Sequence, residues 1–275
     1  MDLKHQYVVA LFDVIASLRR MFERITFNLE FSYHCTELRR INNKPLISFV
    51  VPTKNEAEYL PRLLTSINYI AQSCKVPIET IIVDYMSVDG TPNIARNMGA
   101  KVIEVDKPGI GYASYIGTLS ARGDIIIRTD ADVVITPSAV NEVIRVFTNN
   151  TEKLVATVGH IYYPLELSTN MIAYLYDYYM RKPYNTTGYF IAFRRDVLKK
   201  VNFNPNLRVH EDWDFGKRAY KMFGLRSMYY KPFTAVFVSS RLIKKKGLIR
   251  YLLDQLHVTK AKFASYSQAV TWYER

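Results

Sequence analysis

GDIIIRTDAD, at residues 123–132, joins three consecutive isoleucines to two aspartates that are one residue apart. A run of isoleucines between turn residues is typical of a buried β-strand, because branched side chains pack well on a pleated surface. Asp130 and Asp132 come directly after that run. In open α/β sheets, ligands bind beyond the carboxyl ends of the strands. The stretch therefore predicts a strand that delivers two carboxylates to a binding edge.

The residues around this stretch alternate between strand and helix patterns. From Leu46 onward, short apolar runs are separated by longer stretches with apolar residues at helical spacing. Pro92 suits the first turn of one such helix. This alternation predicts an α/β fold with a mostly parallel central sheet flanked by helices. The expected strands are ISFVVP (47–52), ETIIVD (79–84), KVIEV (101–105), DIIIRTD (124–130) and LVATVGH (154–160), with helices over 56–71, from about 91, over 111–121 and over 137–147.

The second half of the chain has a less regular pattern. Residues 168–180 predict an aromatic helix, and TTGYFIAF (186–193) predicts a strand. Residues 211–222 predict another helix. MYYKPFTAVFV (228–238) predicts two short strands on either side of its proline.

Composition narrows the class of protein. The chain has 275 residues, of which 49% are hydrophobic, and this is ample for a sizeable core. Its formal net charge of +12 favours anionic partners such as nucleotides, phospholipid or nucleic acid. Cys35 and Cys74 are the only cysteines, and no metal-binding spacing surrounds them. A reducing, intracellular setting is therefore the simpler interpretation.

The two ends of the chain differ from the centre. Residues 1–45 predict an N-terminal helical extension and 241–275 a basic amphipathic helix, on either side of a catalytic domain over 46–240. The early apolar run from Tyr7 to Leu18 contains Asp13, and it is shorter than the ~20 residues that a membrane-spanning helix needs. We expect a cytoplasmic protein, with the end helices either lying peripherally on the inner face of the membrane or packing on the core or a second subunit.

The acidic residues suggest specific chemistry. Asp130 and Asp132 offer hard oxygen ligands that suit Mg²⁺ or Mn²⁺, although a polar turn that caps the next helix is the simpler alternative. Asp84, at the end of ETIIVD, can accept hydrogen bonds from a base or ribose. Asp89 is better explained as a loop and helix cap. The pair Glu211–Asp212 can supply a general base or merely stabilise a helix dipole.

Five segments in this order resemble the motifs of glycosyltransferase family 2, whose members adopt the GT-A fold. They are ISFVVPTKNE (47–56), VDYMSVDGT (83–91), ARGDIIIRTDAD (121–132), TTGYFIAFRRDVLKKV (186–201) and HEDWDFGKRAYKM (210–222). The resemblance covers roughly residues 46–240, and ordered matches are more specific than any single motif. The chain differs from the family pattern at Ser114 and Tyr115, where many relatives carry an arginine, and at His210, where glycine is frequent.

The resemblance implies a role for each matching residue. Asp212 would be the catalytic base with Glu211 supporting it, and Gly188 would lie on the acceptor side. Asp132 would be the principal metal ligand, with Asp130 contacting metal or ribose. The nucleotide sugar would be bound by Pro52, Thr53, Glu56, Asp84, Asp130 and Arg241, with Ser87 and Asp89 shaping the loop and Arg218 orienting the acidic helix.

The implied activity is metal-dependent transfer of a sugar, with inversion, from a UDP- or GDP-sugar to a hydroxyl of a glycan, lipid or protein. The cofactor would be Mn²⁺ or Mg²⁺, and a homo-oligomer is an open alternative. One rival is a sugar-phosphate nucleotidyltransferase, but PTKNEAEYL (52–60) lacks the glycines of a phosphate loop. Another is a non-catalytic protein that binds an anionic membrane or nucleic acid. We expect no nucleic acid, because the basic residues concentrate at the two ends rather than in a recognisable module.

Overall fold

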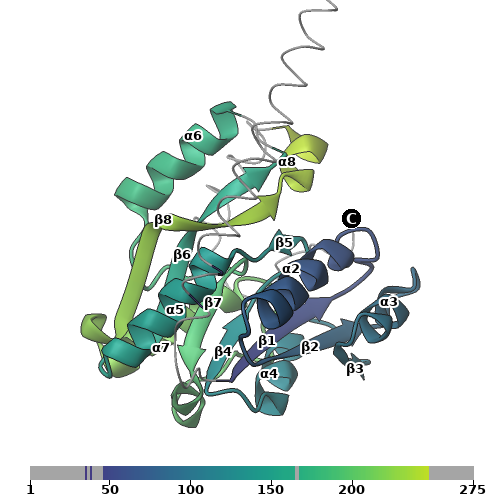
Figure 1. Ribbon diagram of the computed structural model, residues 1–275, viewed down its shortest axis with the longest axis horizontal. Helices are drawn as coiled ribbons and strands as arrows, with labels where there is room; N and C mark the ends of the chain where they lie inside the picture. Colours follow the sequence, from purple (N-terminus) through teal and green to yellow (C-terminus); the bar gives the residue numbers. More distant parts are fainter. Residues whose placement is uncertain (1–34, 36–37, 39–45, 165–166, 248–275) are drawn as a thin grey trace, which may run out of the picture.

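The computed structural model describes residues 35, 38, 46–164 and 167–247 (Figure 1). The predicted N-terminal extension over 1–45 lies outside these residues, except for positions 35 and 38, and so does the predicted C-terminal helix beyond 247. Along the chain the elements are β1 (Ile47–Thr53), α2 (Leu60–Ser73), β2 (Ile78–Tyr85), α3 (Thr91–Asn97), β3 (Lys101–Val105), α4 (Ile110–Ser120), β4 (Ile125–Arg128), β5 (Val133–Val134), α5 (Pro137–Asn149), β6 (Val155–Tyr163), α6 (Leu167–Leu175), the π-helix η1 (Tyr176–Met180), β7 (Ile191–Arg194), the 3₁₀ helix η2 (Arg195–Lys199), α7 (Glu211–Phe223), the 3₁₀ helix η3 (Leu225–Ser227), β8 (Met228–Ser239) and α8 (Arg241–Lys246).

A single sheet of eight strands runs through the described residues, in the order β3-β2-β1-β4-β7-β6-β8-β5. Strands β1 to β4 pair in parallel, which confirms the alternating pattern of the first half. Strand β7 runs antiparallel between β4 and β6, and β5 pairs antiparallel with β8. The parallel half therefore brings the ends of β1, β2 and β4 to one edge of the sheet.

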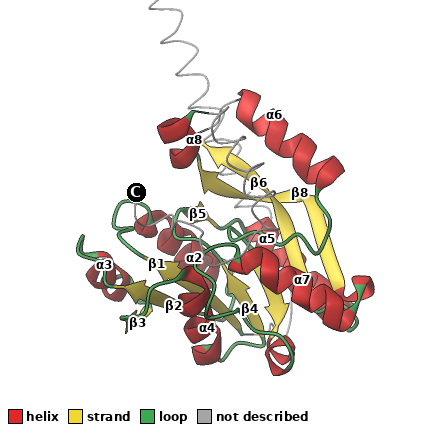
Figure 2. Ribbon diagram, turned by 180° about the vertical axis from the view of Figure 1, so that it is seen from behind, coloured by secondary structure: helices red, strands yellow, loops and turns green. Residues whose placement is uncertain are grey.

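Helices cover both faces of this sheet. Alternate residues of β1 face opposite sides, because side chains alternate along a strand. Phe49 packs with α2 and α5, whereas Val50 packs with α4. Figure 1 shows α2 and α5 in front of the sheet, and Figure 2, from behind, shows α4 and α7. Among the described residues, no helix combines the length and apolarity needed to cross a bilayer.

The last strand corrects one prediction. Residues 228–239 form one continuous strand, β8, rather than two short strands around Pro232. The chain passes the proline through a shift in register against β6, between Val158 and Gly159. A side chain at Gly159 would collide with the carbonyl oxygen of Pro232, so glycine is needed for this close approach.

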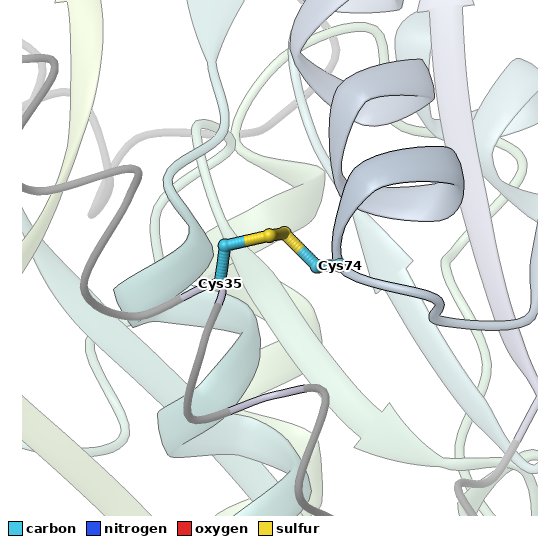
Figure 3. Close-up of a disulfide and its surroundings, with 2 residues drawn as sticks. All are labelled: Cys35 and Cys74. Atoms are coloured by element: carbon cyan, nitrogen blue, oxygen red, sulfur yellow. A yellow bond between two sulfur atoms is a disulfide. The ribbon is translucent and has the colours of Figure 1, made fainter.

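The two cysteines form a second correction. The sequence favoured a reducing setting and predicted no bond between them, whereas in the structure Cys35 and Cys74 form a disulfide with Cα atoms 4.7 Å apart (Figure 3). Both side chains are buried, and Cys74 directly follows the last turn of α2. The bond therefore ties the chain ahead of β1 to the end of α2.

Candidate active site

The first part of the site lies where β1 and β2 end. Thr53 and Asp84 are paired in the strand register, and the Thr53 hydroxyl donates to Asp84 Oδ1 over 2.8 Å. The backbone N–H and the hydroxyl of Ser87 also donate to Asp84, over 3.0 and 2.7 Å. Asp84 is buried, and Pro52 lies one residue before Thr53 in the same buried strand. Asp84 thus fixes the loop after β2 and has limited acceptor capacity left for a ligand.

Asp89 holds the neighbouring loop. Burial alone would raise the pKa of its carboxyl, but hydrogen bonds from Thr91 and Ala57 lower that pKa below its usual range. The bonds run from Thr91 N to Asp89 Oδ1 and from Ala57 N to Asp89 Oδ2, each 3.0 Å long. The Thr91 hydroxyl accepts from the N–H of Glu56 over 2.8 Å. This geometry agrees with the predicted loop role of Asp89, whereas the N-cap position of α3 is Gly90 and has no side-chain cap.

A second group of charges lies after β4. Arg241 is the first residue of α8, and its Nε forms an ion pair with Asp132 Oδ2 at 2.9 Å. Its two terminal nitrogens each lie 2.7 Å from a carboxylate oxygen of Glu56. Burial raises the pKa of Asp132 to about 7, because the nearby charges of Asp130 and Glu56 reinforce burial and Arg241 only partly opposes it. Burial also raises the pKa of Glu56.

The third group comes from α7 and the loop before β7. The N–H of Gly188 donates to Asp212 Oδ2 over 2.7 Å, and the N–H of Trp213 donates to Asp212 Oδ1 over 2.7 Å. The Thr186 hydroxyl donates to the backbone carbonyl of Asp212. His210 precedes α7 and has a φ of 60°, in the left-handed region. Glycine adopts this region most easily, which explains why glycine is frequent at this position in the family pattern. Asp212 is therefore oriented from both sides.

Arg128 joins the second and third groups. Its side chain is completely buried, and Nη1 lies 2.6 Å from Asp130 Oδ1 while Nη2 lies 2.6 Å from Glu211 Oε1. Nη1 also donates to the Gly188 carbonyl over 2.5 Å, and Nε donates to the Ser114 hydroxyl over 3.3 Å. A side chain at Gly188 would collide with this guanidinium, so the position requires glycine. One guanidinium thus connects β4, α4, α7 and the loop before β7.

Glu211 is the buried partner of Arg128. Burial raises the pKa of its carboxyl, and the charges of Asp212 and Asp130 raise it further, while Arg128 opposes the rise. Its side chain is directed at Arg128 rather than at solvent. Of the two adjacent carboxylates, Glu211 is thus buried against Arg128, whereas Asp212 is partly exposed.

The sequence of this chain matches a known family of enzymes. Residues 48–202 match the family described as glycosyl transferase family 2. The chain belongs to glycosyl transferase family 2. A 4,4'-diaponeurosporenoate glycosyltransferase from Staphylococcus haemolyticus is 43% identical over 94 residues, which are 32% of this chain and 24% of that protein. A low-salt glycan biosynthesis hexosyltransferase from Haloferax volcanii is 36% identical over 88 residues, which are 32% of this chain and 21% of the relative. These matches span only about a quarter of the relatives' length.

Solved structures confirm the GT-A fold of this family 2 chain. Glucosyl-3-phosphoglycerate synthase from Mycobacterium tuberculosis, in complex with phosphoglyceric acid, superposes with a TM-score of 0.58 at 20% identity, over 79% of this chain and 80% of that one. Mannosyl-3-phosphoglycerate synthase from Rubrobacter xylanophilus gives a TM-score of 0.58 at 17% identity, over 86% and 80%. At these identities the likeness concerns the fold.

The family 2 motifs are brought together, and they include one arginine, Arg128, that the sequence did not indicate. Arg128 was not among the predicted site residues, and the only signal was a charged residue at the end of a buried isoleucine strand. Arg241, which the resemblance assigns to the nucleotide sugar, forms ion pairs with Asp132 and Glu56 in the structure. Arg218 contacts Asp214 on its own helix and the carbonyl of Asn202, which anchors α7 to the preceding loop.

Only part of a site for a divalent metal can be recognised among the described acidic residues. Within the described ranges, no group of three or more His, Cys, Asp or Glu side chains could hold an ion. Asp130 and Asp132 nevertheless lie close enough for the charge of one to raise the pKa of the other. Mg²⁺ is commonly bound by one or two carboxylates together with substrate phosphates and water. The pair therefore suits a metal that arrives with a diphosphate.

Proposed function

We propose that this chain transfers a hexose from a nucleoside-diphosphate sugar to an acceptor hydroxyl, with inversion at the anomeric carbon. The observation that carries the proposal is the Arg128 junction. It connects Asp130, which together with Asp132 is suited to a metal and diphosphate, to Glu211 on the helix that carries Asp212. A sugar donor and an acceptor base must meet within a few ångströms for such a reaction.

The donor side would use the first two groups of the site. Thr53, Asp84 and the loop that they hold form a polar edge for base and ribose at the ends of β1 and β2. Solved structures of the mycobacterial glucosyl-3-phosphoglycerate synthase contain UDP or UDP-glucose with Mn²⁺. These relatives support a uridine nucleotide as donor and a divalent cation as cofactor here. Asp130 and Asp132 would hold the cation, which supplies charge neutralisation for the departing diphosphate.

The acceptor side would use Asp212. Its carboxylate takes the proton of the acceptor hydroxyl as the hydroxyl oxygen bonds to the anomeric carbon. The bond from that carbon to the diphosphate oxygen breaks on the opposite face, and the electron pair leaves with the nucleotide. Gly188 N–H and Trp213 N–H hold one oxygen each, so the carboxylate is oriented before the acceptor arrives. The cationic Arg241 beside Asp132 would add positive charge near the leaving group.

The test is the replacement Asp212→Asn. The amide keeps the size of the side chain but cannot take a proton, so we expect transfer to fall by about 100- to 10,000-fold. The assay measures sugar transfer from a panel of nucleotide sugars with Mn²⁺, together with thermal unfolding. Asp214→Asn is the matched control, because Asp214 lies on the same helix but pairs with Arg218.

Two outcomes contradict the proposal. Near-normal transfer by a folded Asp212→Asn protein would exclude Asp212 as the base. NMR of the product decides the stereochemistry, and retention of the donor's anomeric configuration would exclude direct displacement.

A further inference from the structure

The segment formed by α6 and η1 packs on the sheet through an unusual ridge. Over residues 169–181, which include Arg181 just after η1, the buried residues recur every four positions and are small or polar: Thr169, Ala173, Asp177 and Arg181. Asp177 Oδ2 accepts from the N–H of His160 over 3.0 Å, and Arg181 Nη1 donates to the carbonyl of Val158 over 3.1 Å. The inner side of this helix is therefore polar and hydrogen-bonded to β6.

The outer side of the same segment is apolar. Between positions 171 and 180, every residue except Ala173 and Asp177 is exposed, and all of these exposed residues are large apolar or aromatic: Met171, Ile172, Tyr174, Leu175, Tyr176, Tyr178, Tyr179 and Met180. Phe233 of β8 extends this surface, with its ring centroid 5.3 Å from that of Tyr178. We call these nine residues the aromatic face.

The aromatic face reverses the usual arrangement of a surface helix. A helix in water normally turns its apolar stripe to the core and its polar side outward. Here Tyr179 and Met180 are 68% and 66% exposed, while an aspartate and an arginine lie inside. Contiguous exposed apolar surface of this kind is typical of a contact site. The arrangement suits a helix whose outer side meets an apolar medium.

The charges around the aromatic face are positive. Within the described residues 167–182, the single carboxylate, Asp177, is buried, and Lys182 is exposed directly after the face. Lys244 and Lys245 of α8 are also exposed. The N–H of Ser240, just before α8, donates to the carbonyl of Tyr163 at the end of β6, the strand that leads into α6. Figures 1 and 2 show α6 and α8 at the same end of the molecule.

We propose that the aromatic face docks on the headgroup region of an anionic lipid bilayer. Tyrosine suits this depth, because its ring is apolar and its hydroxyl remains hydrated. The neighbouring lysines and the net charge of +12 favour anionic lipid over neutral lipid. η1 leads directly into the loop that holds Asp212, so docking here would place the acceptor side of the site near the bilayer.

The experiment is flotation of the full chain with phosphatidylcholine vesicles, with and without phosphatidylglycerol. The test variant is Met171→Ser/Tyr179→Ser/Met180→Ser. The control variant is Leu119→Ser/Met222→Ser/Leu225→Ser, whose original side chains are 58%, 53% and 54% exposed but lie outside the aromatic face. We expect partitioning onto anionic vesicles to fall at least about tenfold in the test variant and to stay unchanged in the control. Lys182→Ala should weaken binding about fivefold at low salt.

The remaining outcomes overturn the proposal. Equal flotation of the test variant and the wild type would place the lipid contact elsewhere, for instance at the chain ends. Equal binding to both vesicle types would show that anionic lipid does not contribute to the binding. Absence of flotation together with a dimer that only the test variant disrupts, measured by sedimentation, would assign the face to a second copy of the chain. Thermal unfolding of both variants at the wild-type temperature shows that the comparison is between folded proteins.

Discussion

A guanidinium at the end of a buried strand needs acceptors on every side, because arginine is rarely fully buried unless it is paired. Arg128 meets this requirement with carboxylates of Asp130 and Glu211 and the carbonyl of Gly188. Glu211 is itself buried, so its charge depends on that of Arg128. Asp130 is partly exposed and remains hydrated. We therefore expect loss of the Arg128–Glu211 pair to lower the stability of the fold more than loss of the Arg128–Asp130 pair.

Replacing Arg128 tests this dependence. The comparison is made above pH 8, because the pKa of Glu211 is raised to about 8 and its carboxyl is ionised only above that pH. Under these conditions Arg128→Met leaves Glu211 buried without a counter-ion, and we expect the free energy of unfolding to fall by about 3–5 kcal/mol. The double variant Arg128→Met/Glu211→Gln removes both charges and should recover much of that loss, because a buried ion pair often gives little net stability over neutral residues. Urea unfolding measures both. Equal instability of the single and double variants, or failure of both to fold, would show that the pair is not the critical contact.

Part of the site was predictable at the scale of single residues. The motifs placed Asp84, Asp132 and Asp212 at element ends, and the structure brings them to one edge of the sheet. The partners of these acids were not predictable, because sequence spacing does not show which distant side chain meets which. Glu56 and Arg241 are 185 positions apart, and only the folded chain brings them into contact.

At the scale of elements, η1 is held by a buried polar cluster rather than by apolar packing. Asp177 Oδ2 lies 2.8 Å from His160 Nδ1, and Asp177 Oδ1 lies 3.3 Å from Arg181 Nη1. Arg181 in turn donates to the Thr187 hydroxyl over 3.0 Å, in the loop that orients Asp212. Burial would raise the pKa of Asp177, but the hydrogen bond and charge of His160 and the charge of Arg181 lower it. The ionised carboxylate is thus part of the fold.

This shift predicts a pH dependence. The native pKa of Asp177 lies below its unfolded value of about 3.9, so its stabilising effect is present above that pH and is lost as the pH falls through the native value. Asp177→Asn should be less stable than the wild type at neutral pH, and the gap should narrow below about pH 4. The charged and titratable groups around Asp177 are His160, Tyr176, Arg181, Tyr189 and Tyr230.

Urea unfolding across this pH range measures the effect. Asp196→Asn is the control, because Asp196 is exposed and its pair with Lys199 is screened by water. A gap between Asp177→Asn and the wild type that stays constant into acid would show that Asp177 does not stabilise the native state through its charge.

Whether an element could be predicted depended on how regular its sequence pattern was. The strands and helices from β1 to β4 follow clear alternation, so their existence was predictable. The continuity of β8 was not, because the register shift at Gly159 lets the strand pass a proline that would otherwise interrupt the ladder. The helix over α6 and η1 was predicted, but the burial of its polar ridge depends on His160 and Val158 of β6, which lie elsewhere in the chain.

At the scale of the whole molecule, the disulfide connects a segment ahead of the sheet to the helix layer. Cys35 and Cys74 are 39 positions apart, and spacing alone cannot tell whether two cysteines meet. Their Cα separation of 4.7 Å lies within the range that a disulfide requires. The bond restricts the unfolded chain, because it closes a loop that would otherwise be open.

Closing this loop should stabilise the protein by about 4 kcal/mol in the chain-entropy description. We expect urea unfolding of the oxidised wild type to show a higher free energy of unfolding than the same protein with reductant, by roughly this amount. Cys35→Ala/Cys74→Ala is the control. Both of its cysteines are gone, so reductant should not change its stability. Thiol titration of the denatured, oxidised wild type should find no free thiol. Two free thiols under those conditions, or the same effect of reductant on the variant, would show that the stability difference has another source.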